Sequence, residues 1–173
     1  MIIIGAVFAR GNSKGIKNKN LLKFHNKTLV GQAVNQAYQS KFIKKVYISS
    51  DSLNIINEAK KYKAIEPFKR PKSLSLDTTP HINTWRHFVK YLKKKKIHTD
   101  YIVDIPTTSP LRNINDINKC IKLAVDKKLD MVFTLTKSNK NPYFNMLEQK
   151  GKKFKIIKNF KKKIRRRQEA PQC

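Results

Sequence analysis

Continuous apolar runs alternate along the chain with segments in which apolar residues recur every three or four positions. The first pattern is typical of strands covered on both faces, and the second of helices with one buried face. Strands are predicted over residues 2–8, 46–49, 64–67, 101–105 and 131–135. Helices are predicted over residues 30–43, 53–62, 79–92 and 114–125. Pro80 falls near the first turn of the third helix, and Asn113 or Asn115 would cap the fourth.

This order of elements predicts an α/β domain with a mostly parallel central sheet flanked by helices, a Rossmann-like arrangement. Ligands bind such sheets beyond the carboxyl ends of the strands, where the loops gather. A chain of 173 residues is long enough for one ordinary domain with its own core.

The regular alternation stops near residue 137. Residues 137–144 are predicted to form a loop, and residues 146–157 a hairpin that turns at Lys150 and Gly151. Residues 150–167 contain eleven Lys and Arg and no acidic residue. This segment therefore supplies a large part of the positive charge of the chain.

The charge of the whole chain is strongly positive. Lys and Arg number 39 against 11 Asp and Glu, a formal net charge of +28, which would attract phosphates, nucleic acid or anionic surfaces. Lysine is accompanied by many Ile and Asn residues, a bias expected from AT-rich codons, so charge alone does not identify a partner. The two cysteines, Cys120 and Cys173, have no zinc-site spacing. The first apolar run is too short to span a membrane, which favours a cytoplasmic protein without membrane contact.

The loop predicted after the first strand, ARGNSKGIKNKN at residues 9–20, combines glycine, small polar residues and cations. Exposed amides and cations of this kind can surround a polyphosphate. The loop has neither the GxxxxGK[ST] nor the GxGxxG spacing. From these residues alone, a phosphate-binding loop and an ordinary solvated turn remain open.

Several stretches resemble the CMP-sialic acid synthetases, also called acylneuraminate cytidylyltransferases. The loop at residues 9–20 resembles the N-terminal signature of that family. Further similar stretches follow in the family's order: YISSDS at 47–52, KRP at 69–71, LSLDTT at 74–79, TSPLR at 108–112 and RQEAP at 167–171. The resemblance implies a nucleotide-diphospho-sugar transferase fold. It also implies a cytidylyltransferase that couples CTP to a nine-carbon acid sugar, releases pyrophosphate and uses Mg²⁺, in cell-surface polysaccharide synthesis.

By this resemblance, Arg10 and Lys19 would hold the triphosphate as the catalytic cations. The predicted nucleotide-binding residues are Gly11, Asn12, Ser13, Lys14, Asn20, Arg70 and His81. His81 stands where relatives often carry a small hydroxyl residue, and either contacts cytosine or lies in solvent at the start of a helix.

The predicted substrate-binding residues are Thr108, Ser109, Arg112 and Arg167. Arg70 and Arg112 would meet nucleotide or sugar carboxylate, and the alternative is that each closes a surface turn. Ahead of TSPLR stand Pro106 and Thr107, where relatives commonly have Gln and Pro. Any contact made by that Gln is therefore absent or replaced.

Two acidic residues, Asp51 and Asp104, follow predicted strands at the expected ligand edge. Asp104 is a candidate metal ligand or a turn cap, whereas capping is favoured for Asp51. Relatives continue past the segment resembling RQEAP with a late Asp motif that holds magnesium, so the chain is expected to be an incomplete nucleotidyltransferase domain. Residues 1–136 would form its nucleotide-binding core, and residues 137–173 the start of the sugar-binding and dimerisation part. A homodimer is expected for the full-length form.

Two rival hypotheses remain. In the first, the chain is a basic nucleic-acid-binding protein whose Phe154 and Phe160 alternate with lysines. In the second, it is a catalytically dead fragment that still binds nucleotide. Selective stabilisation by CTP with Mg²⁺ over ATP and GTP would count against the first, and pyrophosphate release would exclude the second.

Overall fold

A computed structural model describes residues 1–12, 15–65, 69–136, 138, 140–158 and 169–171. The chain divides into two compact units, Met1–Val132 and Phe133–Cys173. The expected binding and dimerisation role of the second unit stays a prediction.

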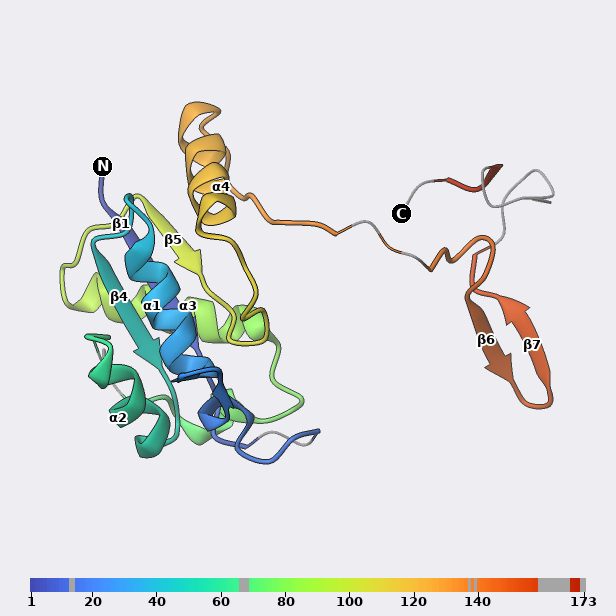
Figure 1. The fold of residues 1–173 in the computed structure, drawn as a ribbon, viewed down its shortest axis with the longest axis horizontal. Coiled ribbons are helices and arrows are strands. Elements are labelled where there is room, and N and C mark those ends of the chain that lie inside the picture. The colour runs from blue at the N-terminus through green and yellow to red at the C-terminus, as the bar shows by residue number, and fades with distance from the viewer. Residues whose placement is uncertain (13–14, 66–68, 137, 139, 159–168, 172–173) are drawn as a thin grey trace. The chain divides into compact units, whose positions relative to one another are not determined.

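The first unit contains a parallel sheet of three strands in the order β4-β1-β5 (Figure 1). The strands are β1 (Ile3–Phe8), β4 (Lys45–Ser49) and β5 (Tyr101–Asp104). In register, β1 pairs Gly5 with Val46 of β4 and with Val103 of β5. A small antiparallel pair, β2 (Lys23–Phe24) with β3 (Lys27–Thr28), lies between β1 and the first helix along the chain. The predicted α/β fold with a parallel central sheet is confirmed.

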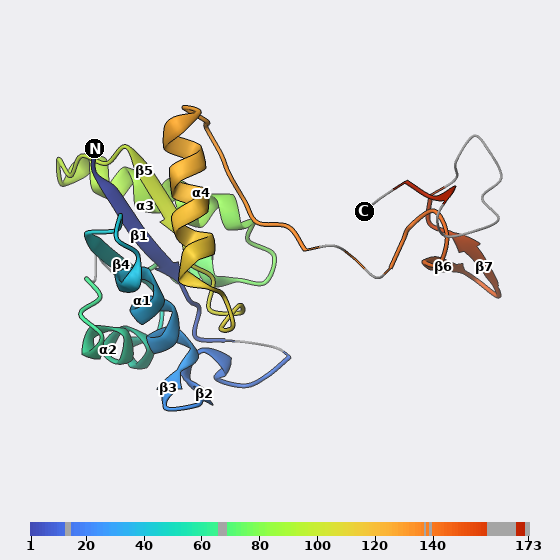
Figure 2. The same ribbon diagram turned by 45° about the horizontal axis from the view of Figure 1, so that its top comes forward.

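Helices cover both faces of this sheet. They are α1 (Leu29–Gln39), α2 (Leu53–Lys61), α3 (His81–Lys94) and α4 (Ile114–Asp126). Ile3 and Val7 of β1 pack in one core with α1, α2 and α4, whereas Ile4 and Ala6 pack in a second core with Phe88 of α3. Because successive residues of β1 point to opposite faces of the sheet, α1, α2 and α4 cover one face and α3 covers the other. In Figure 1, α3 lies behind the sheet and α1 in front of it, and Figure 2 shows the same layers from another direction.

Two helices begin with side-chain caps. Thr28 Oγ1 accepts a hydrogen bond of 3.1 Å from the Gly31 amide at the start of α1. The Asn113 side chain accepts one of 2.9 Å from the Asn115 amide at the start of α4, so Asn113 is the cap and Asn115 is not.

Three helices are each followed, two residues after their last residue, by a lysine with positive φ. Lys63 after α2, Lys96 after α3 and Lys128 after α4 have φ of 66°, 54° and 51°. In each case the next residue's amide bonds back across the last turn: Ala64 to Ala59, Ile97 to Leu92 and Leu129 to Ala124, at 3.3, 2.9 and 2.9 Å. This is the Schellman arrangement, in which the left-handed position is usually glycine.

The structure corrects several sequence predictions. Residues 131–135 do not form a strand, and Met131, Phe133 and Leu135 are 65%, 68% and 84% exposed. No described residue pairs with this segment, so its apolar side chains have no neighbouring strand to pack with. The first helix stops at Gln39 because Ser40 adopts an extended backbone. The third helix begins at His81 rather than at residue 79, and Pro80 is its N-cap residue, near its first turn as predicted. Of the predicted strand at 64–67, Ile65 forms a bridge to Tyr47, and residues 66–67 lie outside the described part of the chain.

The second unit contains the predicted hairpin. Strand β6 (Leu147–Lys150) pairs antiparallel with β7 (Lys153–Ile156), and Gly151 in the turn has a φ of 62°. Both strands are exposed along their whole length. In the described residues of both units, no helix is long and apolar enough to cross a lipid bilayer.

Candidate active site

Three chain segments meet beyond the carboxyl ends of the strands: residues 9–12 and 15–20 after β1, residues 69–80 before α3, and residues 105–113 after β5 (Figure 1). The contacts described below connect them. This edge is where the α/β fold is expected to bind its ligands.

The loop after β1 is braced by neighbouring chain from β4. The Ala9 amide donates to Ser49 O at 3.1 Å, and the Gly11 amide donates to Asp51 Oδ1 at 2.9 Å. A Cβ on Gly11 would lie 3.0 Å from the Cβ of Ser52, so a larger residue would require Ser52 to shift by a few tenths of an ångström. Asp51 thus binds the loop rather than capping α2, whose N-cap residue is Ser52.

Arg10 forms an ion pair at the mouth of the site. Its Nη1 lies 2.5 Å from Asp77 Oδ1, and the two side chains are 35% and 37% exposed. Asp77 belongs to the LSLDTT segment, whose first two residues end the short helix η2 (Lys72–Ser75). Thr79 Oγ1 donates to Ser73 O at 2.7 Å and braces that segment. A second loop therefore supplies the anion that faces the first cation of the signature.

Arg70 is buried, at 6% exposure. Its backbone amide donates to Ser50 O at 2.9 Å, and its guanidinium donates to Ser49 O and, at 3.3 Å, to Ser49 Oγ. Burial lowers the pKa of Arg70 to about 10, Asp51 opposes that shift, and Arg10 adds to it. The side chain thus braces the end of β4 while placing a second positive charge beside Arg10.

Asn20 connects the loops after β1 and β5. It lies in the short helix η1 (Lys19–Leu21) and is 4% exposed. Its Nδ2 donates to Arg10 O at 2.8 Å, and its Oδ1 accepts from Thr107 Oγ1 at 2.7 Å. Thr107, one of the residues that departs from the resembling family, is therefore half of a buried bridge. The two residues are 87 positions apart, so no local spacing reveals the bridge.

The TSPLR loop is held by Gln36, a buried polar residue of α1. Gln36 Nε2 donates to Pro110 O at 2.8 Å and to Arg112 O at 3.2 Å. Arg112 Nη1 donates back to Gln36 Oε1 at 3.0 Å, and its Nη2 donates to Pro106 O at 2.6 Å. Burial lowers the pKa of Arg112, and Asp104 opposes the shift. The sequence prediction missed Gln36, although a glutamine inside the apolar stripe of α1 is a usable signal.

Asp104, at the end of β5, accepts two side-chain contacts. Its Oδ2 lies 2.8 Å from Trp85 Nε1 and 3.1 Å from His81 Nε2. The His81 ring also packs edge-on against Phe8, the last residue of β1, with centroids 5.6 Å apart. The predicted base contact His81 and the predicted metal ligand Asp104 thus form one cluster.

A magnesium site is not completed by these groups. In the described ranges, no three His, Cys, Asp or Glu side chains are grouped as metal ligands would be. Asp104 offers a single carboxylate, and its Oδ2 is already engaged by Trp85 and His81. The Mg²⁺ requirement and the late Asp motif therefore stay predictions.

The remaining predicted residues divide into two groups. Asn12, Thr108 and Ser109 are exposed and Lys19 is half-buried, all on the loops of this edge. Ser13, Lys14 and Arg167 lie outside the described residues.

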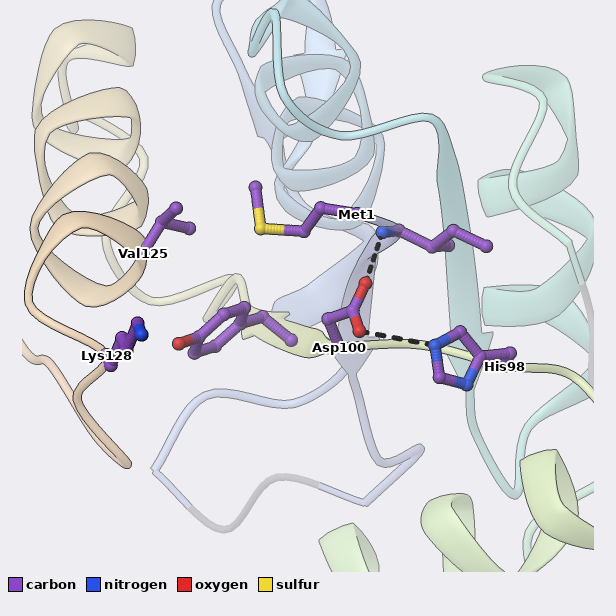
Figure 3. A pocket seen from close by; sticks show the side chains of 7 residues that line it. Met1, His98, Asp100, Val125 and Lys128 are labelled. Atoms are coloured by element: carbon purple, nitrogen blue, oxygen red, sulfur yellow. Dashed lines mark hydrogen bonds and ion pairs between the residues drawn. The ribbon is translucent and has the colours of Figure 1, made fainter.

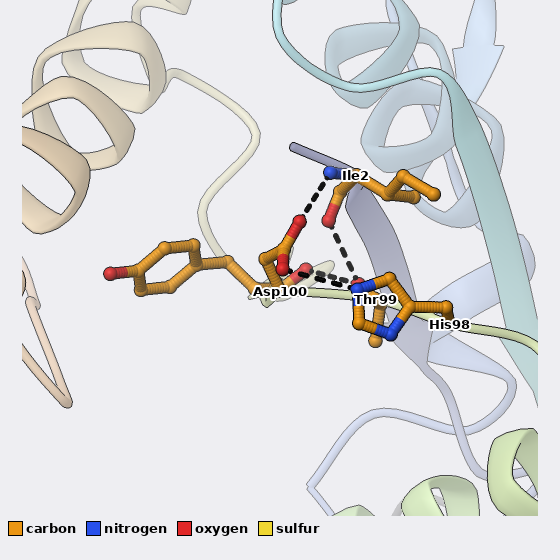
Figure 4. Close-up of polar contacts among 5 residues, drawn as sticks. Ile2, His98, Thr99 and Asp100 are labelled. Carbon is orange, nitrogen blue, oxygen red and sulfur yellow. Dashed lines mark hydrogen bonds and ion pairs between the residues drawn. The ribbon is translucent and has the colours of Figure 1, made fainter.

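A hollow of about 560 Å³ lies at the opposite edge of the sheet (Figure 3). Its lining residues are Met1, Ile2, His98, Asp100, Tyr101, Val125 and Lys128. Asp100 Oδ2 accepts from the Ile2 amide at 2.6 Å and Thr99 Oγ1 donates to Ile2 O at 3.2 Å (Figure 4). The Ile2 amide and, secondarily, His98 lower the pKa of Asp100. These bonds fasten the starts of β1 and β5, at the edge away from the carboxyl-end loops.

A parallel α/β sheet with cationic loops at its carboxyl edge is the architecture of a nucleotide-binding transferase. The sequence profile of the cytidylyltransferase family matches residues 2–165. The chain belongs to the cytidylyltransferase family, which confirms the resemblance and places it among nucleotidyltransferases.

Curated relatives agree with this assignment. The chain is 34% identical over 173 residues to post-translational flagellin modification protein B of Campylobacter coli, covering 99% of this chain and 72% of that protein. It is 33% identical to the CMP-N,N'-diacetyllegionaminic acid synthase of Campylobacter jejuni, with the same coverage. It is 32% identical over 141 residues to an N-acylneuraminate cytidylyltransferase of Escherichia coli, covering 80% of this chain and 32% of that protein.

Solved structures support the fold. A CMP:2-keto-3-deoxy-manno-octonic acid synthetase complexed with CTP superposes with a TM-score of 0.60 at 14% identity, covering 74% of this chain and 49% of that one. A cytidylyltransferase from Leptospira borgpetersenii superposes with a TM-score of 0.57 at 20% identity, covering 74% and 50%. The chain thus spans about half the length of these structures.

Proposed function

We propose that the protein couples CTP to a nonulosonic acid, a nine-carbon acid sugar of the sialic type, and releases pyrophosphate. The observation that carries this proposal is the position of Arg10. Its guanidinium lies at the carboxyl edge, beside Arg70, on a loop tied through Asn20 to the TSPLR loop. The names of the legionaminic and N-acylneuraminate relatives support the substrate class.

In this proposal the sugar's anomeric hydroxyl oxygen attacks the α-phosphorus of CTP and gives up its proton to water. The bond from that phosphorus to the bridging oxygen breaks, and pyrophosphate leaves. Arg10 and Lys19 hold the triphosphate, and Arg10 neutralises charge on the leaving group. Cations fixed in place suit phosphoryl transfer because the reaction gains most from positioning and charge neutralisation.

The other predicted residues receive roles consistent with their places. His81, beside the end of β1, contacts cytosine, and the exposed Thr108 and Ser109 contact the acid sugar. Arg112 shapes the sugar-binding loop, because its guanidinium donates to Gln36 and Pro106 within its own surroundings. Magnesium, when bound, would neutralise phosphate charge, and no step above depends on its placement.

The binding test compares CTP with ATP and GTP by isothermal titration in the presence of Mg²⁺. The variant R10Q/K19Q is expected to lose most CTP affinity. The matched control K93Q/K94Q removes two exposed charges at the far end of α3 and is expected to keep it. Equal affinity for the three nucleotides, or unchanged CTP binding by R10Q/K19Q, would contradict the proposal.

The turnover test measures pyrophosphate release from CTP with N-acetylneuraminic, legionaminic and pseudaminic acids in parallel. Release with one of them identifies the sugar. Selective CTP binding without release with any acid would support a nucleotide-binding fragment instead. Sedimentation of the same preparation tests the expected homodimer.

A further inference from the structure

The ion pair of Arg10 and Asp77 places a carboxylate where the proposed function requires a phosphate. Asp77 Oδ1 lies 2.5 Å from Arg10 Nη1, a close contact between opposite charges. A carboxylate and a phosphate offer the same kind of anionic oxygen to a guanidinium. Both therefore compete for the same donor.

A second carboxylate, that of Asp51, accepts a hydrogen bond from the backbone amide of Gly11, the residue after Arg10. A Cβ at Gly11 would lie only 3.0 Å from the Cβ of Ser52. The partners of the Arg10 and Asp77 pair are side chains, each about one third exposed. Their contact can break by rotation of side chains alone, whereas the Asp51 contact is part of the loop's fold.

The positive charge of the chain favours tight binding of anions, so a competing carboxylate would weaken the binding of phosphates. A net charge of +28 attracts polyanions to the chain as a whole, and Arg70 adds a positive charge beside Arg10. A reaction that releases pyrophosphate from a cationic site must also let that product leave.

We infer that Asp77 is an internal competitor for the triphosphate-binding guanidinium of Arg10. It holds Arg10 in the empty site, gives way to the phosphates of CTP, and returns to Arg10 when pyrophosphate departs. This inference rests on the proposed function, because it takes Arg10 as a phosphate ligand. A competitor for one shared partner lowers the affinity of every ligand that needs this partner by the same factor.

The test measures the affinities of inorganic tripolyphosphate, pyrophosphate and CTP for wild type and D77N by isothermal titration at low salt. Exposed ion pairs contribute little, so D77N is expected to bind all three about two- to fivefold more tightly. The gain is expected to shrink as salt is raised. The matched control D126N removes one exposed carboxylate at the end of α4, close to the hollow at the opposite edge, and is expected to change none of the affinities.

A double-mutant cycle with R10Q assigns the effect to the pair. In the R10Q background, the gain in tripolyphosphate affinity from D77N is expected to be smaller than in wild type, because the shared partner is gone. Weaker or unchanged binding by D77N overturns the inference, as does an equal gain in D126N or a gain that is undiminished with R10Q. These outcomes are separate from nucleotide choice: lost preference for CTP over ATP contradicts the proposed function alone.

Discussion

The buried bridge through Asn20 provides the sharpest test of how the site is assembled. The side chain is 4% exposed and joins Arg10 O at 2.8 Å to Thr107 Oγ1 at 2.7 Å. Asn20→Ala removes both bonds and leaves the Thr107 hydroxyl and the Arg10 carbonyl oxygen without this partner. Thr107 itself is only 5% exposed, so water has little access to its hydroxyl.

The expected cost follows from these two bonds. A net hydrogen bond contributes about 1 kcal/mol, and a buried polar atom left without a partner costs about 1–3 kcal/mol. Loss of both bonds is therefore expected to reduce the free energy of unfolding by about 2–4 kcal/mol. With a urea m-value of about 2 kcal/mol/M, the midpoint of unfolding falls by about 1–2 M.

Urea unfolding followed by circular dichroism measures this effect. Asn57→Ala, on an exposed position of α2, is the matched control and is expected to stay within about 0.5 kcal/mol of wild type. Thr107→Val removes the same bond from its other end, so the double variant with Asn20→Ala is expected to cost less than the two single effects together.

The bridge is refuted if Asn20→Ala leaves the midpoint unchanged, or if the Asn20 and Thr107 effects are strictly additive. Unchanged stability with a loss of CTP affinity would support direct nucleotide contact by Asn20, as the family resemblance implies. The experiment thus separates a structural role from a binding role.

Two further perturbations address the same unit. Gly11→Ala places a Cβ 3.0 Å from the Cβ of Ser52 and is expected to weaken CTP binding, measured by titration. Gly15→Ala adds a Cβ with no atom within 4 Å and is expected to leave CTP affinity unchanged. Equal effects of the two substitutions would contradict the close-packing argument. A hydrogen bond from Lys61 is the main cause that lowers the pKa of Glu58 below its ordinary 4.5, so its stabilisation is complete above pH 4.5 and is lost as pH falls through the folded-state pKa. Glu58→Gln is therefore expected to destabilise by at most about 1 kcal/mol at pH 6 and by less at pH 3 in urea unfolding; an equal difference at both values would refute the linkage.

The sheet and its ligand edge could be predicted from local pattern. Continuous apolar runs mark β1 and β4 because both faces of these strands are covered. The rule that ligands bind at carboxyl ends then places Arg10, Asp104 and Arg112 at one edge from the order of strands and helices alone. The strand predicted at 131–135 failed because an apolar alternation marks a face to be buried but not the partner that buries it.

The contacts that assemble the site could not be predicted in the same way. Asn20 meets Thr107, and Arg10 meets Asp77, across long separations that only the fold closes. Each of these side chains has several chemically suitable partners in a chain rich in polar residues. The role of Gln36 could have been predicted, since a buried amide in an apolar helix face requires hydrogen-bond partners nearby.

The lysines with positive φ that follow α2, α3 and α4 keep the melting temperature of the protein lower than glycine at the same positions would. A left-handed backbone costs a residue with a Cβ about 1–2 kcal/mol, and glycine avoids this strain at the expense of a more flexible unfolded chain. Glycine at Lys63, Lys96 or Lys128 is therefore expected to raise the melting temperature by a few degrees at each position, as calorimetry would measure. The chain has only five glycines, and these three positions can each be replaced by glycine to raise thermal stability at sites away from the ligand edge.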